Sequence, residues 1–114
     1  MHELGITQQI VNIAIKHGEK NNAEKITDLY LIIGELSSVI DDSVQFYWDM
    51  IAENTICEGA KLHFKRVPAI FKCQDCSIEY QLQEGELSPC PACKSSQMEI
   101  IQGNEFHLES INIL

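Results

Sequence analysis

The sequence is poor in basic residues. Its 114 residues include eight Lys and Arg against 17 Asp and Glu, which gives a formal net charge of −9. The deficit is general, because residues 1–67 hold six basic and ten acidic side chains and residues 68–114 hold two and seven. Proteins that bind nucleic acids need cationic side chains to displace the counterions of the phosphates. We therefore predict that nucleic acid is not a partner. A basic partner, a cation or simple solubility accounts better for the acidity.

Long hydrophobic runs are also missing. No apolar stretch approaches the roughly 18 residues that a membrane-spanning helix requires. The first residues lack the positive charge of a secretory signal and carry Glu3 instead. We therefore expect no membrane association and a cytoplasmic location, where thiols stay reduced. This expectation bears on how the five cysteines are interpreted.

Hydrophobic periodicity predicts two helices and a small sheet. Ile6, Ile10 and Ile13 recur at helical spacing, which favours an amphipathic helix over residues 3–20. A second helix is expected over residues 41–53. Strand-like alternation or composition is found in four segments, KITDLYLIIGEL, KLHFKRV, MEII and FHLESINIL.

A segment of different composition interrupts this pattern. Residues 69–97 contain four of the five cysteines, two of the three prolines and few aliphatic side chains. Such a segment cannot build a hydrophobic core of its own and needs a cross-link, such as a bound metal ion or disulfides, to stay folded. We predict an α+β fold with two helices on a small mixed β-sheet, formed by residues 1–68 and 98–114. A zinc-ribbon-like domain with four cysteine ligands, residues 69–97, is expected to be inserted into it.

The four clustered cysteines form two CxxC pairs, Cys73 with Cys76 and Cys90 with Cys93, separated by thirteen residues. Two such turns can supply four thiolates to one tetrahedral ion, and this spacing is close to that of structural zinc sites. The alternatives are two disulfides, a dithiol redox pair, or iron in a rubredoxin-like site. A closed shell of four thiolates leaves no position for substrate, so the metal is predicted to be structural. Cys57 is interpreted as a small buried hydrophobic residue.

The first residues, MHE, contain a possible chelating group. The amine of Met1, the backbone amide of His2 and the imidazole of His2 can bind one metal ion in a plane. Tetragonal nitrogen coordination suits Ni(II) or Cu(II) rather than Zn(II). Glu3 can add an oxygen. The alternative is a solvated histidine at a helix start with a favourable first-turn acid. His17, His63 and His107 are interpreted as packed or solvent-facing side chains.

Several motifs together resemble one known family. MHELGI at the start, IGELSSV at 33–39, the segment 46–62 ending in CEGAKL, the CQDC and CPAC pairs and the late QGNEF follow in the order of the HypA/HybF family. The resemblance covers essentially the whole chain. Its members are nickel metallochaperones for maturation of [NiFe]-hydrogenase.

The resemblance assigns roles to particular residues. It implies a nickel-binding domain, residues 1–68 and 98–114, and a zinc-binding domain, residues 69–97. It implies that His2, with the Met1 amine, binds transported Ni(II), and Glu3 belongs to the same motif. The four cysteines fall on the ligands of structural Zn(II), which are Cys73, Cys76, Cys90 and Cys93. Histidines flank these cysteines in some members, but residues 69–97 contain none. We therefore expect no nickel ligand from that segment.

The resemblance also implies partners. Family members deliver nickel with the GTPase HypB to the large subunit of [NiFe]-hydrogenase, and some serve urease through its accessory proteins. The chain contains no phosphate loop, dinucleotide turn or nucleophile-base pair, so we predict a carrier rather than an enzyme. The sequence leaves open whether the client is hydrogenase, urease or both, and whether the protein forms a homodimer. Other functions left open are a zinc-ribbon adaptor between proteins and a rubredoxin-like electron carrier.

Overall fold

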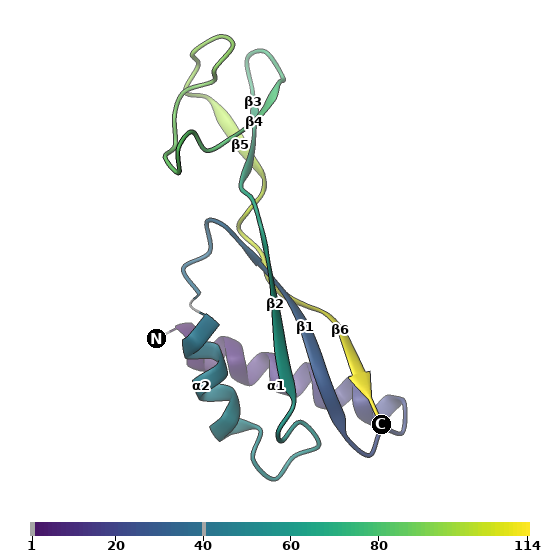
Figure 1. The fold of residues 1–114 in the computed structure, drawn as a ribbon. Helices are drawn as coiled ribbons and strands as arrows, with labels where there is room; N and C mark the ends of the chain where they lie inside the picture. The colour runs from purple at the N-terminus through teal and green to yellow at the C-terminus, as the bar shows by residue number, and fades with distance from the viewer. Residues whose placement is uncertain (1, 40) are drawn as a thin grey trace. The chain divides into compact units, whose positions relative to one another are not determined.

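The computed structural model describes residues 2–39 and 41–114, and these form two compact units (Figure 1). The first unit contains the chain up to Ile32 together with Ser38–Lys65 and Phe106–Leu114. The second contains Ile33–Ser37 and Arg66–Glu105. The chain therefore leaves the first unit and returns to it, which agrees with an inserted domain.

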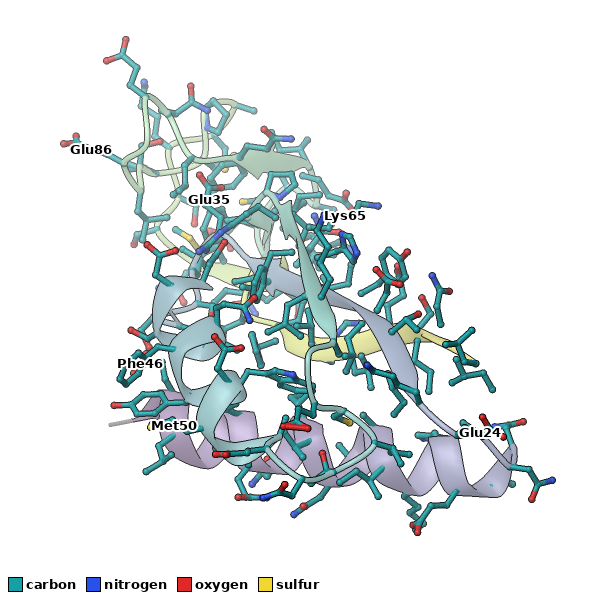
Figure 2. The ribbon with its side chains drawn as sticks, turned by 60° about the horizontal axis from the view of Figure 1, so that its bottom comes forward. Glu24, Glu35, Phe46, Met50, Lys65 and Glu86 are labelled. Carbon is teal, nitrogen blue, oxygen red and sulfur yellow. The ribbon has the colours of Figure 1, made fainter. Side chains whose placement is uncertain are left out.

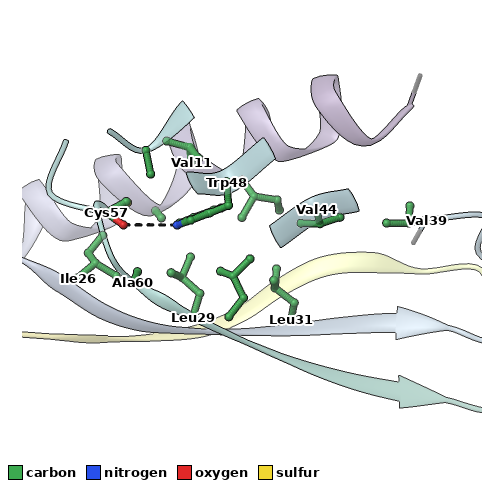
Figure 3. Close-up of a cluster of buried hydrophobic side chains, with 13 residues drawn as sticks. Val11, Ile26, Leu29, Leu31, Val39, Val44, Trp48, Cys57 and Ala60 are labelled. Atoms are coloured by element: carbon green, nitrogen blue, oxygen red, sulfur yellow. Dashed lines mark hydrogen bonds between the residues drawn. The ribbon is translucent and has the colours of Figure 1, made fainter. Parts of the chain in front are cut away.

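The first unit is built from two helices and a three-stranded sheet in the order β2-β1-β6. Its elements are α1 His2–Lys20, β1 Ile26–Gly34, α2 Asp41–Ile51, β2 Lys61–Val67 and β6 Phe106–Ile113. Strands β1 and β2 run in the same direction (Figure 3), and α2 forms the crossover between them. Strand β6 runs the opposite way, since the Leu114 amide donates to the Lys25 carbonyl at 2.8 Å beside the start of β1. The predicted small mixed sheet is confirmed.

Both helices cover the same face of this sheet and enclose the main core (Figure 3). Val44 and Trp48 of α2 are fully buried against Leu29 and Leu31 of β1. The indole Nε1 of Trp48 donates to the Cys57 carbonyl at 3.4 Å, so the one polar atom of this ring has a partner inside the core. On α1 the buried stripe runs through Ile10, Val11 and Ala14.

One detail of the predicted α1 stripe is wrong. The hydrophobic spacing places Ile13 on the buried face together with Ile6 and Ile10, but Ile13 is 43% exposed. The buried face instead includes Thr7, whose hydroxyl donates to the Glu3 carbonyl one turn earlier. A Thr side chain can enter a core when its own helix supplies the acceptor. The buried face therefore centres on Thr7, Ile10, Val11 and Ala14, and Ile13 lies outside it.

The second unit is a small antiparallel sheet in the order β4-β3-β5. Its strands are β3 Ile70–Cys73, β4 Glu79–Gln81 and β5 Met98–Gln102. The buried cluster consists of only five residues, two of which are cysteines: Ala69, Phe71, Cys73, Tyr80 and Cys90. Such a core is too small to hold the unit without further constraint.

Packing assigns more of the chain to the second unit than the predicted zinc-binding segment 69–97. Strand β5 pairs with β3, so residues 98–102 belong to the sheet of this unit. The amide of Gly34 donates to the Glu105 carbonyl at 2.7 Å, so the end of β1 also belongs to the second unit. The assignment of nickel to one domain and zinc to the other stays a prediction. Within the part of the chain described here, no helix is long and apolar enough to cross a membrane.

Candidate functional site

The two CxxC pairs form two turns of the same design. In each, the amide of the residue after the second cysteine donates to the carbonyl of the first, from Ser77 to Cys73 at 2.9 Å and from Lys94 to Cys90 at 2.8 Å. Ser77 and Lys94 both have positive φ, 66° and 62°, which turns the chain back. The amide of each first cysteine then donates to the carbonyl of the residue five positions later, at 2.9 Å in both turns. Both turns therefore present two sulfur atoms to one side.

The four sulfur atoms meet at one point. All four lie within 4.8 Å of one another, with Cys73 Sγ 3.5 Å from Cys93 Sγ and Cys76 Sγ 3.6 Å from Cys90 Sγ. A tetrahedral ion bound at about 2.3 Å requires sulfur atoms about 3.8 Å apart, so the cluster has the size of such a shell. Disulfide bonds require about 2.05 Å, and all five cysteines are free. The disulfide alternative is thus not the arrangement of this chain.

The environments of the four thiols differ. The pKa of Cys73 is lowered to about 7, because the backbone amide of Cys76 donates to its sulfur atom. Burial alone would raise the pKa of Cys90, but the backbone amides of Cys93 and Ala92, together with the neighbouring thiols, lower it. The Ser95 amide also favours a lower pKa for Cys93. The neighbouring thiols, Cys73 most of all, act against it and raise the pKa of Cys93 to about 12.

These pKa shifts indicate what the cluster can bind. Four thiolates this close repel one another, so without a cation only part of the cluster ionises near neutral pH. A divalent metal ion reverses that preference, and its binding would release protons from the remaining thiols. The residues present therefore fit a soft divalent ion held by sulfur alone.

A side-chain contact that the sequence did not suggest links the two turns. The Ser95 hydroxyl donates to Asp75, which joins the loop inside the first CxxC pair to the second residue after the other pair. The Ser95 hydroxyl also accepts from the Gln97 amide at 3.0 Å. Serine and aspartate are common in turns for other reasons, so their spacing in the sequence carried no signal.

The N-terminal motif is described only in part. Met1 and the side chain of His2 lie outside the described residues, and the proposed nickel ligands on them are therefore not tested. The backbone of His2 begins α1, and Glu3 is a half-buried acid in its first turn. The first amides of a helix have no acceptor within it, so the amides of the motif are available for other bonds.

The other histidines agree with their interpretation as packed or solvent-facing residues. His63 lies 2.8 Å from Asp28 and stacks on Tyr30 with ring centroids 4.6 Å apart. His17 and His107 are exposed. Among the described residues, the four cysteines form the one group of three or more potential metal ligands.

Cys57 stands apart from the cluster. It is fully buried in the core of the first unit, and burial raises the pKa of its thiol to about 11. Its interpretation as a small buried hydrophobic residue is confirmed.

The chain is similar to known proteins over nearly its whole length. Residues 1–113 match the family model described as hydrogenase/urease nickel incorporation, metallochaperone, hypA. The hydrogenase maturation factor HypA of Caldanaerobacter subterraneus subsp. tengcongensis is 40% identical over 114 residues, which cover 99% of each protein. That of Dehalococcoides mccartyi is 39% identical over 113 residues, 99% of this chain and 94% of the relative.

Solved structures show the same fold. The solution structure of the Ni metallochaperone HypA from Helicobacter pylori matches with a TM-score of 0.74 at 26% identity, over 98% of this chain and 97% of that one. A second solution structure of a HypA protein matches with a TM-score of 0.79 at 28% identity, over 100% of this chain and 97% of that one.

Proposed function

Because the chain belongs to the HypA family of hydrogenase/urease nickel incorporation metallochaperones, we propose that it binds Ni(II) at its N-terminus and delivers it during maturation of [NiFe]-hydrogenase. The observation that carries this proposal is the extent of the family match, which starts at residue 1 and includes the MHE motif. The family consists of metallochaperones, and nickel is accordingly a cargo rather than a catalytic cofactor.

The ligand chemistry of the N-terminus supports nickel. The Met1 amine, the His2 amide and the His2 imidazole supply three nitrogen atoms in fused five- and six-membered rings, and Glu3 can supply a further donor. Planar nitrogen donors favour Ni(II) over Zn(II). The amine and the amide must lose protons on binding, so affinity should fall as the pH drops. A site at a chain end can also exchange its ligands one at a time, as transfer to a client requires.

We assign Cys73, Cys76, Cys90 and Cys93 to structural zinc, which would hold the second unit together. The supporting observations are the four-sulfur shell and the small apolar core around it. Iron fits the same sulfur geometry. An electron carrier would hold iron and be coloured when oxidised, whereas the proposed protein contains zinc and is colourless.

The proposed transfer needs partners. We propose that the GTPase HypB cooperates in release, because the chain itself has no phosphate-binding loop. The hydrogenase large subunit is the proposed recipient, and urease is a second client that the family description allows. We propose that these reactions take place in the cytoplasm, where a reducing environment keeps the thiols available for metal.

The nickel site is tested by a change that leaves the rest of the chain intact. A short extension before Met1 converts the terminal amine into an amide and removes one ligand. We expect loss of high-affinity nickel binding in a titration of the extended chain, with zinc content unchanged. Unchanged nickel affinity would contradict the proposed chelate.

Two substitutions separate the nickel and zinc sites. His2→Ala should abolish nickel binding and hydrogenase maturation while zinc content is kept, and His17→Ala, on the same helix, should alter neither. Cys73→Ser should reduce zinc content. A protein in which His2→Ala supports normal maturation would instead be an adaptor that carries no nickel.

A further inference from the structure

Helix α2 carries two large apolar side chains on its outer surface. Phe46 is 61% exposed and Met50 is 51% exposed, and Figure 2 shows both on the outside of the helix. They are four residues apart, so they share one face of α2. The Phe46 ring makes an edge contact with Tyr47, with centroids 5.4 Å apart and planes at 72°. Aromatic and Met side chains are enriched at protein interfaces, where such exposed groups become buried.

The fold does not need these two side chains for its core. The side of α2 that faces the sheet is already occupied by Val44 and Trp48, both with no exposed surface. Phe46 and Met50 are absent from the side chains that pack on this cluster. Substitution of either by a polar residue should therefore leave the first unit folded.

Acidic residues surround the pair. Asp42 precedes Phe46 by one turn, Asp49 precedes Met50 directly, and Glu53 lies two residues beyond the end of the helix. We call Asp42, Phe46, Asp49 and Met50, together with Glu53 just after the helix, the acidic face of α2. From residue 26 to residue 60 the chain contains seven acidic side chains and no Lys, Arg or His. The last turn of α2 has no basic residue, although basic charge there would stabilise the helix dipole. Asp42 in the first turn suits the dipole, but Asp49 near the C-terminal end of the helix does not.

We propose that the acidic face of α2 is a docking surface for a partner protein whose apolar pocket is rimmed by Lys and Arg. Phe46 and Met50 fill the pocket, and the carboxylates of Asp49 and Glu53 meet the basic rim. Complementary charge of this kind speeds association and selects the partner. A second copy of this chain would bring like charges together, and nucleic acid or an anionic membrane would be repelled for the same reason.

The inference rests on the proposed function only for the choice of probes. Binding of the purified full chain to two purified proteins, the cognate partner GTPase and the hydrogenase large-subunit precursor, is measured by calorimetry. Phe46→Ser should weaken binding to one of them by about tenfold or more, as expected for a central aromatic anchor. Ile13→Ser, which removes an exposed apolar side chain from α1, should leave the affinity unchanged.

The charge contribution has its own matched pair of variants. Asp49→Lys should weaken the same complex, and the loss should shrink as salt is raised because exposed charges are screened. Glu19→Lys makes the same charge change in the last turn of α1 and should have little effect. Thermal unfolding of each variant verifies that the fold is kept.

The outcomes distinguish this proposal from its rivals. It is overturned if neither probe binds, if Phe46→Ser and Asp49→Lys leave the affinities unchanged, or if Phe46→Ser acts by dissociating a dimer of this chain in sedimentation. Phe46→Ser should keep its nickel affinity. A chain that binds no nickel but loses partner binding with Phe46→Ser would refute the proposed function and support the docking surface.

Discussion

Cys57 and the four clustered cysteines differ in what surrounds their sulfur atoms. Cys57 lies in an apolar core, which disfavours the thiolate, whereas backbone amides donate to Cys73 and Cys90 and favour it. Spacing alone separated these two kinds of cysteine in the sequence, because the pairs are CxxC and Cys57 is alone. The groups that lower the pKa of the individual thiols are backbone amides, and no sequence pattern indicates where these amides lie.

The buried thiol of Cys57 should be inert in the native protein. With a pKa of about 11, about one thiol in a thousand is ionised at pH 8, and the side chain has no exposed surface. In the metal-loaded protein, alkylation of Cys57 by iodoacetamide should proceed only at the rate of unfolding. Mass spectrometry of the digested protein measures it, with a denatured sample as control. Rapid complete modification of the native chain would contradict the buried position.

Asp28 and His63 form a pair that residue patterns could not reveal, since 35 positions separate them. The hydrogen bond from His63, with a smaller contribution from Thr27, lowers the pKa of Asp28. A carboxyl group with a lowered folded pKa stabilises the fold above its unfolded pKa of about 4, and this contribution is lost as pH falls through the folded value. The pair therefore contributes at neutral pH and not in strong acid.

His63→Ala should raise the pKa of Asp28 toward its ordinary value. The stability difference between wild type and this variant should shrink as the pH falls below about 4, because Asp28 becomes protonated in both. Carbon NMR of the Asp28 carboxyl group gives the midpoint. His107→Ala removes an exposed histidine from β6 and is the control. An identical Asp28 midpoint in wild type and His63→Ala would disprove the coupling.

At the scale of helices and strands, periodicity located most elements but not their pairing. The two predicted helices, 3–20 and 41–53, agree closely with α1 His2–Lys20 and α2 Asp41–Ile51. The sheet of the second unit was less visible. Strands β3 and β4 have four and three residues, too short for an alternating pattern, and Cys73 closes one of them. Their pairing depends on the two cysteine turns, and the sequence showed only the cysteines.

Two glycines meet where β1 ends. A Cβ atom built on Gly34 would lie 2.1 Å from the carbonyl carbon and oxygen of Gly103. Both of these atoms are backbone, which cannot move aside as a flexible side chain can. Gly103 itself has φ of 122° and lies against Ala69. This contact explains the presence of glycine in both IGEL and QGNE.

Gly34→Ala should therefore be severely destabilising, by about 2 kcal/mol or more, as for other overpacked sites. Gly5→Ala is the matched control, because a Cβ there has nothing within 4 Å and Ala favours a helix by about 1 kcal/mol. Urea unfolding of both variants measures the difference. Equal stability of Gly34→Ala and wild type would show that the two glycine backbones do not pack as described.

At the scale of the whole molecule, the family and the fold class could be predicted from the sequence. They depend on the order of MHE, the two CxxC pairs and the strands around them, and that order is fully visible in the chain. The extent of the second unit could not be predicted, because it depends on the pairing of β5 with β3. The acidic face of α2 was also missed, since the buried and exposed apolar residues of one helix look alike until the fold assigns their faces.

The central claim is that nickel and the cysteine-bound metal occupy separate sites. X-ray absorption at the nickel edge of the untagged chain, loaded with a stoichiometric amount of Ni(II), tests it directly. We predict a planar shell of nitrogen and oxygen atoms around nickel without sulfur, while the zinc edge of the same sample reports the four-sulfur site. Sulfur atoms bound to nickel, with an identical spectrum for His2→Ala, would contradict the account.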